Sequence, residues 1–297
     1  MSIRIYPHRL GSASAGVLAS ALSRKLQARV LRLPEDSITY RPRPRHIIIN
    51  WGNSRPPLWL ANVSPPSRYE DRNRRPVMLN HWSQVNAARN KINAFIRFNQ
   101  CNIPHPLWTT MPSIADEWLK AKEPVVCRHT ITSYGGQGIE IVWPGNILPS
   151  APLYTKYYRR ESEWRIHVMN APGATYNKVI LVQQKLRRHD CPDDAVNWQV
   201  RNHRNGWIFA NQPTNFTKTL VPEGIEAAQK SVIALGLSFG AVDLLQQKNG
   251  KVYVLEVNTA PALEGLTLDT YAASFIELLN NTRYPYGGCT LFPPGGL

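Results

Sequence analysis

The stretch that decides the fold is "FGAVDLLQQKNGKVYVLEVNTAP", residues 239–261. Two apolar segments flank Asn249-Gly250, a dipeptide typical of the two-residue turn that joins the strands of a hairpin. With such a turn, Asp243 lies directly opposite Glu256 on the neighbouring strand. Two carboxylates in that position repel each other, and burying them without partners costs several kcal/mol or more. We therefore expect a further group at this hairpin that compensates the two negative charges.

A divalent cation would supply that compensation. The same register pairs Leu245 with Val254. Strict alternation places Glu256 and Asn258 on the strand face of Val252. Carboxylate and amide oxygens are hard ligands of the kind that Mg²⁺ takes in proteins. The alternative is a solvent-exposed edge on which Glu256 is simply hydrated, but the apolar neighbours favour a metal site formed by Asp243, Glu256 and Asn258.

Composition places few limits on the fold and more on the location. The chain has 297 residues, which suits one large unit or two to three small domains, and 43% of them are hydrophobic. No apolar run approaches the roughly 20 residues of a membrane span, and residues 10–22 lack the features of a secretory signal. The four cysteines lie far apart and form no CxxC pair, which argues against a disulfide framework or zinc site. These features predict a cytoplasmic protein.

The net charge of +15 is the most prominent bulk feature. It is spread along the chain, with basic clusters at 41–46, 68–75, 157–165, 185–190 and 201–205. One interpretation is a solvated basic surface. The other is an acidic partner, which could be nucleic acid, nucleotide phosphates or an acidic peptide. The sequence contains no zinc finger, RNP motif or basic zipper.

Helical and strand patterns alternate along the chain. Residues 1–50 indicate a strand, a helix from 14 to 27 and an apolar strand, and residues 50–76 indicate a connector or substrate loop. Helices are predicted at 83–100, 113–122, 221–237 and 268–280. Strands are predicted at both ends of 124–143, at 153–158, 163–170 and 178–188, and in the hairpin, with an irregular tail over the last 15 or so residues. The mixture of helices with antiparallel hairpins predicts an α+β or α/β assembly.

Two further segments carry candidate binding residues. In "PVVCRHTITSYGGQGIEIVW", residues 124–143, apolar strands flank Gly135, Gly136 and Gly138, whose backbone N–H groups could approach phosphate oxygens closely. A plain hairpin turn would give the same pattern. Arg128 lies in the strand before this loop and could reach a phosphate. In "EWRIHVMN", residues 163–170, Arg165 and His167 share one strand face, which a solvated polar surface would also explain.

In their order along residues 80–265, these parts resemble the ATP-grasp superfamily, and specifically its carboxylate–amine ligases. "NKINAFIRFNQCNIPHP" (90–106) is similar to the helix that opens the ATP-grasp module, and "LYTKYYRRESEWRIHV" (153–168) to its hinge and the strand that follows. "VRNHRNGW" (200–207) resembles the segment near the acyl site. The most specific match is the Asp…Glu-x-Asn metal signature of the opening hairpin. The most similar members are glutathione synthetases, ribosomal-protein-modifying ligases and phage-type amidoligases with a short N-terminal domain.

The resemblance implies an α+β fold in which two subdomains clasp ATP, preceded by a small Rossmann-like α/β domain. It divides the chain into an N-terminal domain (1–80), a central ATP-grasp subdomain with the Gly-rich loop (81–152), and a C-terminal subdomain with the metal site and the irregular tail (153–297).

The resemblance also implies roles for individual residues. Asp243, Glu256 and Asn258 would hold one or two Mg²⁺ on the ATP phosphates. The residues implied at the acyl-phosphate or γ-phosphate are Arg165, Arg201 and Asn202. Those implied to contact ATP are Lys91, Arg128, Gly135, Gly136, Gly138, Tyr154, Lys156, Tyr157 and Lys185. Two residues depart from the family pattern: Arg128 stands where many members have Lys, and Lys156 replaces an acidic hinge residue.

The implied activity is an ADP-forming ligase that joins a carboxylate to an amine through an acyl-phosphate. Its substrates would include a carboxylate and an amine, with an acidic peptide or another anionic macromolecule favoured by the basic surface. One alternative is an ATP-grasp kinase that phosphorylates a small molecule without forming an amide. Another is a non-catalytic, basic nucleic-acid-binding protein on an ATP-grasp scaffold.

Overall fold

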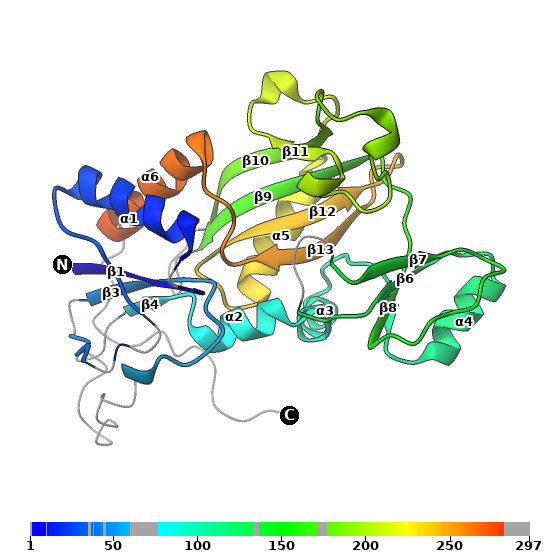
Figure 1. The fold of residues 1–297 in the computed structure, drawn as a ribbon, viewed down its shortest axis with the longest axis horizontal. Coiled ribbons are helices and arrows are strands. Elements are labelled where there is room, and N and C mark those ends of the chain that lie inside the picture. Colours follow the sequence, from blue (N-terminus) through cyan, green and yellow to red (C-terminus); the bar gives the residue numbers. More distant parts are fainter. Residues whose placement is uncertain are drawn as a thin grey trace.

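A computed structural model describes residues 2–9, 11–34, 37, 39–43, 46–59, 77–132, 137–170 and 177–281. The described residues form three β-sheets with helices packed against them (Figure 1). The expected tail after residue 281, much of the 50–76 connector, and Gly135 and Gly136 lie outside the described residues. None of the described helices has the length and apolar character needed to cross a membrane.

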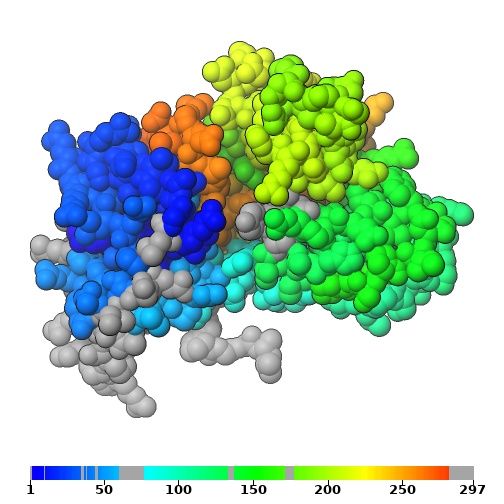
Figure 2. All heavy atoms as spheres, in the orientation of Figure 1, coloured from blue at the N-terminus to red at the C-terminus, as the bar shows by residue number. Residues whose placement is uncertain are grey.

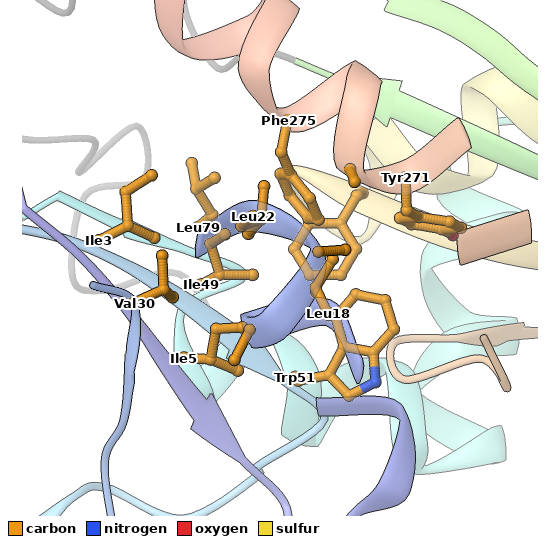
Figure 3. Close-up of a cluster of buried hydrophobic side chains, with 14 of the residues drawn as sticks. Ile3, Ile5, Leu18, Leu22, Val30, Ile49, Trp51, Leu79, Tyr271 and Phe275 are labelled. Carbon is orange, nitrogen blue, oxygen red and sulfur yellow. The ribbon is translucent and has the colours of Figure 1, made fainter. Parts of the chain in front are cut away.

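The N-terminal sheet is parallel, with the strand order β2-β1-β3-β4. Ser12 begins the helix that covers it, because its Oγ accepts a hydrogen bond from the Ala15 N–H. Apolar side chains of the sheet and this helix pack against a C-terminal helix, as the cluster that includes Trp51, Tyr271 and Phe275 shows (Figure 3). The elements are β1 (Ser2–Pro7), α1 (Ala13–Leu26), β2 (Leu31–Arg32), β3 (His46–Trp51), β4 (Val77–Leu79) and α6 (Gly265–Asn281).

The single helix predicted at 83–100 is two helices, α2 (Trp82–Arg89) and α3 (Lys91–Gln100). Asn90 separates them: its backbone is extended, and its Oδ1 accepts hydrogen bonds from the first N–H groups of α3, over 3.0 and 3.2 Å. Lys91 therefore stands at the beginning of a new helix, which fixes the direction of its side chain.

The central sheet is antiparallel, with the order β5-β8-β6-β7, and α4 packs against it. Its last strand in the sequence pairs with both β5 and β6, so the sheet extends beyond residue 152, where the sequence predicted a boundary. Its elements are β5 (Trp108–Thr109), α4 (Pro112–Lys120), β6 (Val125–Arg128), β7 (Ile139–Val142) and β8 (Leu153–Lys156).

The C-terminal sheet is antiparallel, with the order β11-β10-β9-β12-β13. One face packs against α5 (Pro222–Ala234) in a core that includes Trp164, Val242 and Val257. In Figure 2 the segment between β10 and α5 lies above the central part of the chain, and the N-terminal part lies to the left. The strands are β9 (Ser162–Asn170), β10 (Asn177–Arg187), β11 (Trp207–Ala210), β12 (Phe239–Gln246) and β13 (Val252–Asn258).

Candidate active site

A cleft lies between the central sheet and the C-terminal sheet, where residues 157–161 connect β8 to β9. The cleft is open, and its volume is about 890 Å³ when the solvent at its mouth is included. Its walls come from β6, β7 and β8 on one side and from β9, β10, β12 and β13 on the other. Predicted site residues that line it are Lys91, Arg128, Lys156, Tyr157, Lys185, Arg201, Asp243 and Glu256.

The hairpin turn differs from the sequence prediction. Gln247 N donates to the Lys251 carbonyl over 2.8 Å, so three residues, Lys248 to Gly250, form the loop. Gly250 has φ of +82°, which suits glycine at the end of such a loop. The extra loop residue shifts the register near the tip, and Leu245 pairs with Tyr253 rather than with Val254.

A β-bulge restores the expected pairing of the two carboxylates. Leu255 is the extra residue, because Leu244 pairs with Val254 while Asp243 pairs with Glu256. The bulge also changes the strand face on which Glu256 lies, compared with the sequence prediction. Val252, Val254 and Val257 face the core against α5, whereas Leu255 and Glu256 both line the cleft. Strict alternation predicted that Glu256 shares a strand face with Val252. That prediction is wrong, because Glu256 lines the cleft while Val252 packs in the core.

Three charged residues form one row across three neighbouring strands. Arg165 on β9 pairs in register with Asp243 on β12, which pairs with Glu256 on β13. Arg165 Nε and Nη2 donate to the two Asp243 carboxylate oxygens over 2.6 and 2.7 Å. Lys91 Nζ lies 3.4 Å from Glu256 Oε2. Each carboxylate thus has its own cation, and the repulsion expected from the sequence is balanced within the protein.

Asn258 bridges the two carboxylates at the end of β13. Its Nδ2 donates to Asp243 Oδ2 over 3.1 Å and to Glu256 Oε1 over 3.3 Å. The three predicted metal-binding residues are therefore brought together within hydrogen-bonding distance. Rotation of the Asn258 amide by half a turn would present its oxygen in place of its nitrogen.

Burial and neighbouring charges act on these groups in opposite directions. Burial alone would raise the pKa of Asp243, but the charge and hydrogen bonds of Arg165 hold this pKa below its ordinary value. Burial lowers the pKa of Lys91, although the Glu256 carboxylate opposes that change. Asp243 is consequently an anion that can accept hydrogen bonds or bind a metal ion at neutral pH.

The side chains fit a hard divalent cation. Two carboxylates and one amide supply oxygen donors, which is the chemistry that Mg²⁺ prefers, with its remaining positions left to water or phosphate. No group of three or more His, Cys, Asp or Glu residues suited to a metal occurs in the described part of the chain, and this site itself offers two carboxylates and one amide. The donor set is nonetheless smaller than a protein-only cage, so a ligand that brings its own oxygens would complete it.

A second charged cluster surrounds Glu163, which the sequence analysis did not single out. Lys185 Nζ lies 2.7 Å from Glu163 Oε2, and Arg160 Nε lies 2.6 Å from Oε1. Lys185 also donates to the Arg201 carbonyl over 3.1 Å. Arg201 stacks its guanidinium over the Trp207 ring, 4.1 Å from the centroid. Glu163 sits two residues before Arg165 on β9, and alternation could have placed it on the cleft face.

The central sheet contributes apolar walls and one buried cation. Val126, Ile139 and Ile141 line the cleft opposite Leu245 and Leu255. Arg128 is buried beside them, and its Nε has no hydrogen-bond partner in the structure. Burial lowers the pKa of Arg128 below its ordinary value, though Glu256 opposes this. A buried guanidinium with an unsatisfied donor beside an apolar wall is suited to an anionic ligand with an apolar part.

Several predicted residues lie elsewhere. Tyr154 does not line the cleft: its ring is buried in the central core, and its hydroxyl donates to the Pro149 carbonyl over 3.0 Å. Asn202 caps a short 3₁₀ turn by accepting from Asn205 N, and it does not line the cleft either. Lys156 lines the cleft but pairs with Glu123. Gly138 is described, with φ of +67°, and its carbonyl accepts from His129 N over 2.8 Å.

The polar face of β9 continues below Arg165 as a buried network. His167 is 1% exposed; its Nδ1 lies 3.0 Å from the Tyr271 hydroxyl, and its Nε2 lies 2.8 Å from Gln183 Oε1. Burial lowers the pKa of His167 to about 4. A solvated polar face, the alternative considered for Arg165 and His167, is therefore wrong: α6 covers this part of the sheet.

No protein-family model matches the sequence. Over 112 residues the chain is 34% identical to the "Probable alpha-L-glutamate ligase" of Coxiella burnetii (strain Dugway 5J108-111), a match that covers 37% of this chain and 33% of the relative. The match thus spans about a third of the length of such curated relatives.

Solved structures match over nearly the whole chain. D-alanyl-alanine synthetase A from Vibrio cholerae O1 biovar eltor has a TM-score of 0.64, with 13% identity, over 95% of this chain and 98% of that one. The ATP-grasp ligase PsnB, complexed with a minimal precursor, Mg and ADP, has a TM-score of 0.62, with 10% identity, over 93% and 96%. At this level of identity the likeness concerns the fold: each solved structure shares its arrangement of sheets and helices with this chain.

Proposed function

We propose that this chain, which has the ATP-grasp fold, is an ATP- and Mg²⁺-dependent ligase that joins a carboxylate to an amine and releases ADP and phosphate. The observation that carries the proposal is the row formed by Arg165, Asp243 and Glu256 together with Lys91, in which Asp243, Glu256 and Lys91 line the cleft. Paired carboxylates among cations are what phosphoryl transfer requires, since this chemistry depends on charge neutralisation more than on a protein nucleophile.

In this proposal Asp243, Glu256 and Asn258 hold the metal ion. A metal ion held there would supply positive charge that offsets the charge of the phosphates. Lys91 and Arg128 bind nucleotide phosphates, and Lys91 can exchange its contact with Glu256 for a phosphate oxygen. The Gly-rich loop predicted from the sequence would offer backbone N–H groups to those phosphates; of its three glycines, Gly138 lies among the described residues.

The remaining cleft residues bind the rest of the nucleotide. The apolar walls from β6, β7, β12 and β13 receive the base. Tyr157 and Lys156 lie at the connection between the two sheets, where they border the base, and Lys185 approaches a phosphate from β10. The Tyr154 hydroxyl is committed to backbone carbonyl and N–H groups, so this residue supports the strand and does not contact the nucleotide.

The reaction has two steps. A substrate carboxylate oxygen attacks the γ-phosphorus of ATP, the bond to the β–γ bridging oxygen breaks, and ADP leaves. An amine nitrogen then attacks the acyl carbon, phosphate leaves with the bonding electrons, and the amine loses a proton. Arg165 and Arg201 neutralise the oxygens that gain charge in both steps, and Asn202 supports the loop that carries Arg201. Asp243 orients the Arg165 guanidinium through its two hydrogen bonds.

The substrate class follows the fold neighbours and the charge. PsnB has been crystallised with a precursor peptide, and the curated relative is named for glutamate ligation. Together with a net charge of +15, these names support a peptide or amino acid that carries carboxylates. Residues 1–80 then border the substrate, while the sheets within residues 81–297 clasp the nucleotide. The free Cys101, Cys127 and Cys191 suit a reducing cytosol, where ATP is supplied.

The test is ADP release in the presence of Mg²⁺ with paired panels of carboxylates and amines, including glutamate and acidic peptides. We expect turnover only when both substrates are present. Asp243→Asn and Glu256→Gln should each lower the rate at least 100-fold, a loss comparable to removing one transition-state donor. Asp116→Asn, which changes a partly exposed carboxylate paired with Lys120 on α4, is the matched control and should leave the rate unchanged.

Three results would contradict the proposal. Full turnover in Asp243→Asn would remove the metal site. ADP release that needs a carboxylate but no amine, with a stable phosphorylated product, would identify a kinase. Tight Mg·ADP binding without turnover on any pair would leave the fold without this activity.

A further inference from the structure

The carboxyl edge of the N-terminal parallel sheet forms a fixed surface. β1 and β3 run in the same direction, so their carboxyl ends meet, with Pro7 in register with Trp51. Two buried asparagines hold the loop that follows β3. Asn53 N donates to Asn50 Oδ1 over 2.8 Å, and Asn53 Nδ2 donates to the Pro7 carbonyl over 3.2 Å. Ligands of open parallel sheets commonly bind beyond this end of the strands.

This edge adjoins the strand that carries Glu256 and Asn258. Gly52 packs so closely on the loop after β13 that a Cβ atom there would lie 2.6 Å from the Ala260 Cβ. Leu263 N in the same loop donates to Ser14 Oγ of α1 over 3.3 Å. Asn258 precedes Ala260 by two residues, a span of at most about 7 Å along the chain. The edge therefore begins within one or two side-chain lengths of the candidate metal site.

Two arginines and one histidine with exposed side chains lie at this edge. His8 and Arg9 follow β1 directly, and Arg89 is the last residue of α2. Arg89 Nη1 donates to Ser54 Oγ over 3.2 Å, and Arg89 also lines a small hollow with Lys91, Glu256 and Asn258. Burial, with the charges of Arg9 and Arg89, lowers the pKa of His8. We call His8, Arg9 and Arg89 the basic edge.

We propose that the basic edge binds a second carboxylate of an acidic peptide whose reacting carboxylate lies in the cleft. The proposal rests on the function proposed above and names its substrate class. Side chains on one face of an extended peptide repeat about every 6.6 Å, so a neighbouring carboxylate on the same face of the peptide can lie outside the cleft, towards the adjoining edge. Glutamate residues would place carboxylates at that repeat, while nucleic acid would supply phosphates and no group that the ligase reaction consumes.

The probe is acetylated, amidated tetraglutamate, with tetraglutamine as the neutral analogue, titrated by calorimetry into the full chain with Mg²⁺ and ADP present. We expect the glutamate peptide to bind at least ten times more tightly than the glutamine peptide at low salt. Arg9→Ala and Arg89→Ala should each weaken that binding at least fivefold, and Arg89→Lys should restore most of it. The affinity for ADP should stay unchanged in Arg9→Ala, because Arg9 does not line the nucleotide cleft.

Arg24→Ala is the matched control. Arg24 is an exposed arginine in the last turn of α1, roughly 16 Å along the helix from its N-terminus at the edge. We expect no change in peptide binding for this variant, although it removes the same charge.

Three results would overturn the proposal: an equal loss in Arg24→Ala and Arg89→Ala, tetraglutamine binding as tight as tetraglutamate, or a single-stranded oligonucleotide that displaces the peptide and depends more strongly on Arg9 and Arg89. Failure of the ligase proposal has a separate signature. Peptide binding that depends on Arg9 and Arg89, without turnover of any acidic peptide, would keep the edge as an acidic-peptide site and reject the ligase. Turnover of acidic peptides with a KM insensitive to both residues would reject the edge alone.

Discussion

Arg165 lies directly opposite Asp243 on the neighbouring strand, and its guanidinium donates to both carboxylate oxygens, over 2.6 and 2.7 Å. The pair connects catalysis and stability, because the same carboxylate is a candidate metal ligand and the partner of a buried cation. Removing either side chain leaves a charge that solvent reaches poorly, since the Arg165 and Asp243 side chains are only 17% and 12% exposed.

Substitutions of Arg165 should separate charge from geometry. Arg165→Met leaves Asp243 without its main partner, and we expect the free energy of unfolding to fall by roughly 3 kcal/mol. Arg165→Lys keeps the charge but loses the two-pronged contact, so it should cost about 1 kcal/mol while lowering turnover at least tenfold. Urea denaturation and ADP release measure the two effects. Equal stability losses in both variants would contradict the role of the bidentate geometry.

Lys91 should hold the metal site closed to free Mg²⁺. Its Nζ lies 3.4 Å from Glu256, so a metal ion that binds alone must compete with it. We expect Lys91→Met to strengthen Mg²⁺ binding in the absence of nucleotide by about fivefold, the equivalent of about 1 kcal/mol, and to weaken ADP binding. Calorimetry measures both. Lys120→Met, which breaks an exposed pair with Asp116, is the control, and weaker Mg²⁺ binding in Lys91→Met would reject this reasoning.

His167 should make stability depend on pH. In the folded chain, burial lowers its pKa to about 4, whereas in the unfolded chain it titrates near 6.5. Below pH 6.5 the unfolded chain binds a proton that the folded chain does not, so the stability present at higher pH is lost as the pH falls towards 4. We expect a loss of about 2 kcal/mol between pH 7 and pH 5.

The comparison variant is His167→Gln, whose amide can bond to Tyr271 and Gln183 without titrating in this range. Urea denaturation at both pH values gives the difference. A pH dependence that is the same in both proteins would assign it to other groups.

Gly52 should be intolerant of a side chain. Its φ of +80° is unfavourable for other residues, and an added Cβ would lie 2.6 Å from the Ala260 Cβ. We expect Gly52→Ala to cost about 2–4 kcal/mol, combining backbone strain with overpacking. Adding Ala260→Gly should recover only the packing part. Gly11→Ala, where no atom lies within 4 Å, should change stability by less than about 0.5 kcal/mol in a denaturation experiment.

Local patterns predicted most elements and the two facing carboxylates. The longer strands, most helices and the Asp243–Glu256 pair lie where apolar alternation and turn residues indicate them, whereas the short strands β2, β4, β5 and β11 were not predicted. The ATP-grasp fold expected from the order of motifs is confirmed by the fold neighbours. The break between α2 and α3 was missed, although Asn90 is a strong N-cap, because helical periodicity continues across it.

What local pattern could not predict depends on contacts between distant segments. The hydrogen bond from Lys185 to Glu163 joins residues that lie 22 positions apart in the sequence, on two different strands. Tyr154 could face either the cleft or the core, and only the packing of α4 decides for the core. The basic edge combines two residues that follow β1 with the last residue of α2, and no sequence window contains them together. Likewise, a bulge is invisible to alternation, which is why Glu256 was placed on the wrong face.

Because of that bulge, β13 could lose one residue without losing the pairing of its other residues with β12. Counted from the loop at Lys248–Gly250, removing Leu255 would leave a regular ladder in which Glu256 still faces Asp243 and Val257 still faces Val242. The strand would lose Leu255, an apolar residue of the cleft wall, and keep the Glu256 carboxylate. A one-residue deletion would thus weaken the proposed contact with the nucleotide base while sparing the candidate metal ligands. A change in the length of β13 at Leu255 could therefore alter which nucleotide base is preferred. It would leave the Asp243–Glu256 pair, and the phosphate chemistry proposed for it, in place.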